Sequence, residues 1–107
     1  MYTLLHYLTA IGRDPFQEWL DSLTDRQAQA RVLTRIGRFL AGNFGDAKSV
    51  GGGVMEARIH WGPGYRVYYA ITNRQVILLL LGGDKRNQQA DIQQAIEYWQ
   101  DWKRRKQ

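Results

Sequence analysis

The amino-acid sequence predicts an α+β fold with an N-terminal strand, a helical hairpin, a three-stranded antiparallel meander and a C-terminal helix. Three observations lead to this prediction. Two stretches with helical apolar spacing follow an apolar N-terminal segment, three β-rich runs come next, and a further helical stretch ends the chain. The length of 107 residues and the 44% apolar content are typical of one globular domain covering residues 1–107.

The N-terminal part of the chain predicts one strand and two helices. Residues 2–8 (YTLLHYL) are apolar and aromatic, as expected of a strand. Asp14-Pro15 supplies an N-cap and a proline at the first helical position, before apolar residues at helical spacing in 16–23. Thr24 with Gln27 resembles a capping box for a second helix, which Gly42-Asn43 would end.

The middle of the chain predicts the meander. Val54–His60, Tyr65–Thr72 and Gln75–Leu81 are separated by the turn signals Gly62-Pro63-Gly64 and Asn73-Arg74. The third of these strands is apolar on both faces, which favours a central position in the sheet, paired with the N-terminal strand.

The last part of the chain predicts a helix that begins after Gly82-Gly83, with Asp84 as its cap. Its apolar positions recur at helical spacing from Ile92 to Trp102. The basic tail 103–106 complements the negative end of that helix. Both Gly82-Gly83 and Gly51-Gly52-Gly53 lack the spacing of a phosphate-binding loop, so we interpret them as turns or bulges.

Composition restricts the classes of function. The 15 Lys and Arg against 10 Asp and Glu give a formal net charge of +5, which favours a polyanionic partner, although a basic surface also serves solubility. The absence of cysteine excludes a disulfide framework, a zinc–thiolate site and a thiol nucleophile. Residues 1–20 do not resemble a signal peptide, and Val76–Leu81, the longest apolar run, is too short to span a bilayer. A cytoplasmic protein without a membrane partner is expected.

Strand alternation places candidate site residues on one face of the sheet. Glu56, Arg58 and His60 alternate with apolar residues along their strand. If the next turn closes symmetrically, His60 stands opposite Arg66, and Arg58 stands opposite Tyr68. Two guanidinium groups, one imidazole and one phenol could then bind a phosphate and move protons. The alternative is a solvated polar face with Glu56 as its counter-ion.

Two lysines flank this face along the chain. Lys48 precedes the meander and Lys85 follows it, so a sheet could gather both with Arg58 and Arg66 into one phosphate-binding pocket. RNA or DNA is therefore the expected target. Trp61, in the adjacent turn, could stack on a base, whereas the other tryptophans are expected in the core. No His, Asp or Glu group has the spacing of metal ligands.

Five sequence segments resemble one known family. The addiction-module killer proteins, HigB-like members of the RelE/ParE toxin superfamily, are similar to this chain between Phe16 and Ile92. The matching segments are F-x-x-W-L, G-N-x-G-D-x-K, G-x-G-V-x-E-x-R-I, G-P-G-Y-R-V-Y and L-L-G-G-D-K-x-x-Q-x-x-D-I. The resemblance implies a RelE-like fold, in which a helical hairpin packs on a largely antiparallel sheet.

The resemblance also implies a function. It implies the toxin of a type II toxin–antitoxin system, a ribosome-dependent endoribonuclease that cuts messenger RNA (mRNA) and thereby inhibits translation. Attack of the ribose 2′-OH on the adjacent phosphate would need no metal or other cofactor. The implied partners are the ribosome, mRNA and a cognate antitoxin, which we expect to be a helix-turn-helix protein.

The resemblance assigns roles to individual cations. Arg58, Arg66 and Lys85 match the basic residues that orient the phosphate and stabilise its developing charge. Lys48 matches the lysine before the meander. The remaining expected RNA contacts are Tyr68 and Arg86.

The general base is left open by the sequence. Gln88, Gln89 and Asp91 follow the Gly-Gly-Asp-Lys segment, where a catalytic tyrosine or histidine often occurs in the superfamily. The candidates are His60, whose ordinary pKa suits proton transfer, and a lysine with a pKa lowered by nearby cations; Tyr68 and Lys85 are the alternatives if His60 is structural. Two other functions are compatible with the fold: non-enzymatic inhibition of DNA gyrase, and an inactive toxin that only binds its antitoxin.

Overall fold

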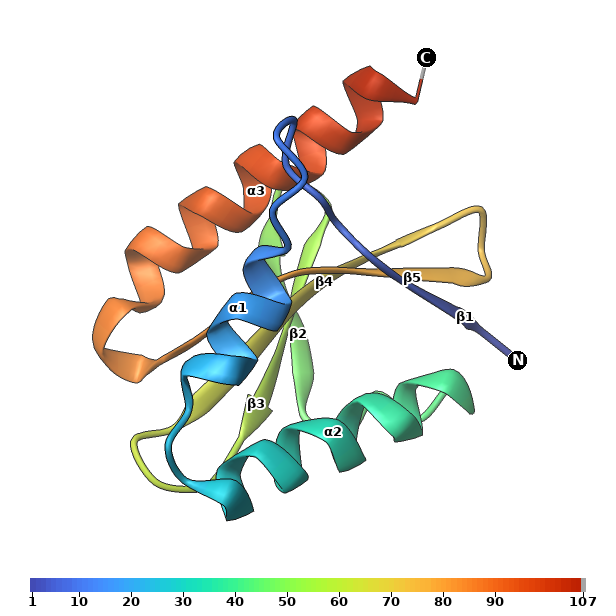
Figure 1. Ribbon diagram of the computed structural model, residues 1–107. Coiled ribbons are helices and arrows are strands. Elements are labelled where there is room, and N and C mark those ends of the chain that lie inside the picture. Colours follow the sequence, from blue (N-terminus) through green and yellow to red (C-terminus); the bar gives the residue numbers. More distant parts are fainter. Residues whose placement is uncertain (107) are drawn as a thin grey trace.

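The computed structural model describes residues 1–106, which form a compact α+β fold with a five-stranded mixed sheet and three α-helices (Figure 1). In chain order the elements are β1 (Thr3–His6), α1 (Pro15–Ser22), α2 (Arg26–Leu40), β2 (Ala47–Gly51), β3 (Val54–Ile59), β4 (Tyr65–Thr72), β5 (Val76–Asp84), a short 3₁₀ helix η1 (Lys85–Asn87) and α3 (Gln88–Arg105). The predicted α+β class and the C-terminal helix are confirmed. No helix within residues 1–106 is long and apolar enough to cross a membrane.

The strands are arranged in the order β1-β5-β4-β3-β2. β1 pairs with β5 in parallel and the other neighbours are antiparallel, so the predicted pairing of the N-terminal strand with the end of the meander is confirmed. The edge strand β2 was not predicted. It forms because Gly51, Gly52 and Gly53 all have positive φ, which turns the chain back along β3.

Helices cover both faces of the sheet. α1 and α2 lie on one face and α3 lies on the other (Figure 1). Aromatic and aliphatic side chains of these helices pack on the two faces. Alternate residues of β5 contribute to the hydrophobic cores on the two faces. Ile77 and Leu79 face α1 and α2, while Leu78 and Leu80 face α3. This two-sided burial is the reason that β5 is apolar throughout.

Aspartates cap the helical segments α1, α2 and η1, and only the cap of α1 is as predicted. Asp14 caps α1 and Pro15 occupies its first turn, as predicted. The cap of α2 is Asp25 and not Thr24, because the Asp25 carboxylate accepts a hydrogen bond from a backbone N–H of the first turn. Asp84 caps η1, and α3 begins only at Gln88.

The interpretation of Gly82-Gly83 as a turn or bulge is wrong, because both residues belong to β5 and pair in regular register with Val67 and Arg66 of β4. Their role is to allow close packing. A Cβ atom at Gly82 would overlap the indole ring of Trp19 in α1, and one at Gly83 would overlap the carboxylate of Asp91 in α3. The two glycines therefore let α1 and α3 approach β5 from opposite faces.

We predict that Gly82→Ala lowers the free energy of unfolding by about 1–3 kcal/mol, because the added methyl group overpacks the contact with Trp19. Gly37→Ala is the matched control. A Cβ atom at Gly37 meets nothing within 4 Å, so alanine should stabilise α2 by about 0.5–1 kcal/mol. Urea unfolding of both variants measures the difference, and a Gly82→Ala protein as stable as wild type would refute the packing argument.

Candidate functional site

The β3–β4 hairpin brings the predicted site residues together in a register different from the predicted one. Arg58 stands opposite Arg66 and Ile59 opposite Tyr65, so the predicted pairs of His60 with Arg66 and of Arg58 with Tyr68 are wrong. The loop between the last paired residues spans residues 60–64, with positive φ at Gly62 and Gly64, and is therefore centred on residue 62 and not on residue 63 as predicted. The register differs by two residues, and therefore every side chain keeps its predicted face.

The centre of this arrangement is the carboxylate of Glu56, which is completely buried. Its Oε1 lies 3.3 Å from Nε of Arg58, and its Oε2 lies 3.5 Å from Nε of Arg66. Tyr68 Oη and Gln88 Nε2 donate hydrogen bonds to the same Oε2 at 3.1 and 2.9 Å. We call these five residues the Glu56 cluster. It joins β3, β4 and the first residue of α3.

Burial of the Glu56 cluster corrects two expectations. Glu56 is the counter-ion of Arg58 and Arg66, as the alternative interpretation of this face predicted. The part of the face around Glu56 is not solvated, because α3 covers it; Tyr68 has no exposed surface and Arg66 is only 8% exposed. Tyr68 is therefore not an accessible RNA contact in this structure. Burial, together with the charge of Glu56, raises the pKa of Tyr68 far above its usual range, so the phenol keeps its proton and cannot serve as a base.

Beyond the cover of α3 lies an open pocket of about 590 Å³, which we call the hairpin pocket. It is lined by residues 58–66 and Lys85. The structure thus brings together Arg58, His60, Arg66 and Lys85 from three separate parts of the chain. No acidic side chain is among the described residues that line it. Guanidinium and ammonium groups that line a pocket without carboxylates favour the binding of an anion. A guanidinium group can also donate two parallel hydrogen bonds to the oxygens of one phosphate.

Exposure differs among the cations of the hairpin pocket. Arg58 is 34% exposed although its Nε contacts Glu56, and Lys85 is exposed and forms no ion pair within residues 1–106. Arg66 donates a hydrogen bond of 2.8 Å from Nη1 to the carbonyl oxygen of Gly64 in the loop. Arg66 therefore shapes the floor of the pocket, while Arg58 and Lys85 present charge at its opening.

His60 lies at the edge of the hairpin pocket and is paired with Asp46. Its Nε2 is 2.7 Å from Oδ2 of Asp46, and its side chain is 77% exposed. The hydrogen bond with His60 lowers the pKa of Asp46, so that carboxylate stays ionised and orients the imidazole. An exposed imidazole held at one nitrogen by a carboxylate can exchange a proton through its other nitrogen.

Two predicted RNA contacts lie outside the hairpin pocket. Lys48 is exposed on β2, opposite Glu56 in the register, but does not line the pocket. Arg86 lies beside Lys85 in η1, where its guanidinium donates two hydrogen bonds to Asp84, at 3.2 and 2.7 Å. Within residues 1–106 no three His, Cys, Asp or Glu side chains form a group that could hold a metal ion.

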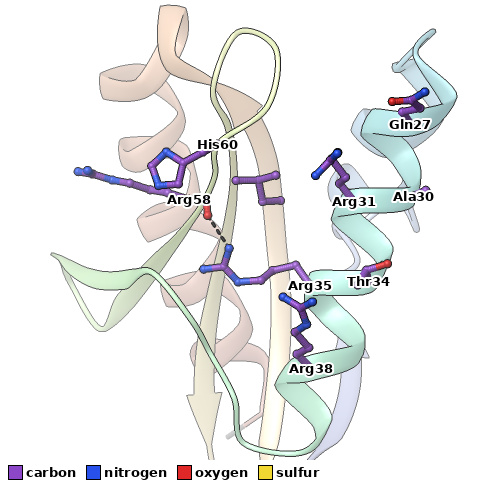
Figure 2. Close-up of a pocket in the computed structure, with 9 residues that line it drawn as sticks. Gln27, Ala30, Arg31, Thr34, Arg35, Arg38, Arg58 and His60 are labelled. Atoms are coloured by element: carbon purple, nitrogen blue, oxygen red, sulfur yellow. Dashed lines mark hydrogen bonds between the residues drawn. The ribbon is translucent and has the colours of Figure 1, made fainter.

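Two residues that position the site were missed by the sequence analysis. Arg35 of α2 donates a hydrogen bond to the backbone oxygen of Arg58 at the end of β3 (Figure 2). It also donates hydrogen bonds to the backbone oxygens of Phe44 and Asp46, and so holds the loop before β2 against α2. The second residue is Gln88, whose side chain donates a hydrogen bond to Glu56 and so joins α3 to the cluster. No local sequence pattern indicates either role, because the hydrogen-bond partners are backbone carbonyls or a buried carboxylate far away in the sequence.

We predict that Glu56→Gln destabilises the fold by about 3–5 kcal/mol, because it leaves the buried guanidinium of Arg66 without a counter-charge. Glu97→Gln makes the same chemical change on the exposed side of α3 and should alter stability by less than about 0.5 kcal/mol. Chemical denaturation of the two variants measures the contrast. Equal stability of the two variants would show that Glu56 does not hold the cluster.

We also predict that His60→Ala raises the pKa of Asp46, because the hydrogen bond that lowers it is lost. A lowered carboxyl pKa stabilises the fold above the ordinary aspartate range, and this contribution is lost as pH falls through the lowered value. In the variant this contribution, and with it the loss of stability on acidification that Asp46 causes, should therefore be smaller. Carbon-detected NMR titration reports the carboxyl directly. Asp84, whose pKa Arg86 lowers, is the internal control and should not change.

Comparison with known proteins places the chain in a family. No family model matches it. A Haemophilus influenzae protein described as an uncharacterized protein is 49% identical to it over 80 residues, which cover 75% of this chain and 81% of that protein. Identity at this level over most of both chains shows common ancestry and a shared fold, and this chain therefore belongs to the same family as the Haemophilus influenzae protein.

Proposed function

We propose that this protein is the toxin of a type II toxin–antitoxin system, a member of the RelE/ParE superfamily that cleaves mRNA on the ribosome. The observation that carries the proposal is the hairpin pocket. Arg58, Arg66, Lys85 and His60 surround one open volume whose lining, among the described residues, contains no carboxylate. Such a site favours a phosphodiester over a neutral or cationic ligand.

The positions of the family-like segments support the same proposal. The E-x-R-I segment contributes Glu56 and Arg58, Y-R-V-Y contributes Arg66, and G-G-D-K contributes Lys85. These segments are separated in the chain but adjoin one pocket. The RelE-like arrangement that we propose has the helical hairpin α1–α2 on one sheet face and α3 on the other. Segments that resemble a nuclease family thus supply the residues of a phosphate-binding site.

The proposed reaction is an intramolecular transesterification. The ribose 2′-oxygen attacks the adjacent phosphorus and loses its proton to a base; the bond from phosphorus to the 5′-oxygen breaks, and that oxygen takes up a proton. The products are a 2′,3′-cyclic phosphate and a 5′-hydroxyl. Arg58 and Arg66 orient the phosphate, and Lys85 at the opening stabilises the negative charge that develops on its oxygens.

His60 is the general base that the geometry favours. Its imidazole is exposed at the pocket edge and is oriented by Asp46, whereas Tyr68 is buried and retains its proton. Lys85 is the acid that protonates the leaving oxygen, since an exposed ammonium at the opening has protons to donate. Each step then uses side chains of the chain itself, without a cofactor.

The proposal includes the partners of the toxin. The ribosome would present the mRNA strand, and a small helix-turn-helix antitoxin would neutralise the protein by covering cations of the hairpin pocket. Expression without the antitoxin should therefore arrest growth, and coexpression should restore it.

We predict that Lys85→Ala lowers mRNA cleavage by a factor of about 10² or more, because one charge-stabilising group is lost from the transition state. Arg58→Gln should have a similar effect, with some loss of stability because Arg58 also contacts Glu56. Arg74→Ala is the matched control, since Arg74 is exposed in the β4–β5 turn at the other end of β4. Primer extension on an mRNA, with and without active ribosomes, measures cleavage.

Two outcomes would contradict this assignment. Full toxicity of folded Lys85→Ala protein would remove Lys85 from the site. If the wild type cuts no mRNA on ribosomes but inhibits DNA supercoiling by purified gyrase, the nuclease proposal fails and gyrase inhibition replaces it.

A further inference from the structure

A second basic depression lies beside the hairpin pocket, between α2 and the end of β3 (Figure 2). It has a volume of about 460 Å³ and we call it the α2 groove. Arg31, Arg35 and Arg38 line it from α2 at positions i, i+4 and i+7, which place all three on one side of the helix. Gln27 and Thr34 add an amide and a hydroxyl to the same side.

The three arginines of the α2 groove have different roles. Arg35 is partly buried, and its guanidinium N–H groups donate hydrogen bonds to backbone oxygens. These bonds fix the position of the guanidinium group without a hydrogen bond to a carboxylate. Arg31 is exposed and stacks on Trp61, with Cζ 3.8 Å from the ring centroid. Arg38 is exposed and has no ion pair within residues 1–106. The stacked face of Trp61 is therefore occupied and is not a free platform for a base.

The charges of the α2 groove are crowded. Burial lowers the pKa of Arg35, and the nearby charge of Arg38 contributes to that lowering. None of the described residues that line the groove is acidic, and three of them are the α2 arginines Arg31, Arg35 and Arg38. The side chain of Arg58 points away from α2, toward Glu56 (Figure 2). The charge of Asp46 acts on the pKa of Arg35 in the opposite direction, but Arg31 and Arg38 form no ion pair within residues 1–106. Like charges in one groove repel one another, and an anion bound between them relieves that repulsion.

The α2 groove shares a wall with the hairpin pocket. Arg58, Ile59 and His60 line both depressions, which therefore meet at the end of β3. From Gln27 to Arg38 the helix rises about 16 Å, at about 1.5 Å per residue, which is longer than a single phosphate group. A strand with regularly spaced phosphates fits a track of this length.

We propose that the α2 groove is a second phosphate-binding site, which holds the backbone of a single RNA strand on the side of His60 away from Lys85. The inference rests on the proposed function for its choice of RNA. Guanidinium forks match phosphate oxygens in pairs, and the shared wall makes one continuous strand the simplest ligand for both depressions. The Arg31 and Arg38 side chains contact phosphates directly, while Arg35 fixes the shape of the groove.

The test measures binding separately from cleavage. A short fluorescent oligoribonucleotide with 2′-O-methyl riboses has no free 2′-OH and cannot be cut, so its anisotropy reports affinity alone. The double variant Arg31→Gln/Arg38→Gln should raise Kd about tenfold at moderate salt. The slope of log Kd against log salt concentration should fall by about 1.4, at about 0.7 per lost phosphate contact on a single strand. Arg74→Gln, which removes one distant cation, should change Kd by less than about twofold.

The outcomes separate this inference from the proposed nuclease. If the double variant loses affinity and salt dependence while the wild type cuts no mRNA on ribosomes, the groove binds RNA and the nuclease proposal alone fails. Wild-type affinity and slope in a folded double variant would overturn the groove assignment, as would the lack of any wild-type binding at low salt. Loss of binding to polyglutamate with unchanged RNA binding would assign the groove to an acidic protein segment and also overturn it.

Discussion

The buried carboxylate of Glu56 is the constraint on which the rest of the site depends. An ionised carboxylate without solvent is stable only when cations and hydrogen-bond donors surround it, and here Arg58, Arg66, Tyr68 and Gln88 do so. Those partners come from β3, β4 and the start of α3. The same contacts that satisfy the carboxylate therefore fix the distance between the two guanidinium groups and the direction from which α3 leaves the sheet.

The position of α3 in turn determines where the molecule is open. Along the middle of the sheet, the side chains of α3 bury Tyr68, Leu78 and Leu80, so no ligand reaches that part of the face. The hairpin end remains accessible, where residues 58–66 and Lys85 form the pocket. On the opposite side of the hairpin, Arg35 holds α2 to the same strand end and creates the adjoining groove. Two basic depressions thus share a wall at the end of β3.

Local patterns predicted the α+β class, most element positions and the shared face of Arg58 and Arg66. The face prediction survived a wrong register because a shift of two residues preserves alternation. Features that depend on distant contacts were not predictable. β2 has a weak strand pattern and forms only by pairing with β3; Gly82 in β5 reflects the approach of Trp19; and burial of Tyr68 depends on how α3 packs.

The chemical ends of the RNA fragments test the central claim, that an array of protein side chains at this pocket promotes attack by the 2′-OH. Wild-type protein would be incubated with mRNA and active ribosomes, and the fragments analysed by mass spectrometry. The account predicts a 2′,3′-cyclic phosphate on the upstream fragment and a 5′-hydroxyl on the downstream fragment. A 3′-hydroxyl with a 5′-phosphate would mean that water is the nucleophile, and would contradict the mechanism.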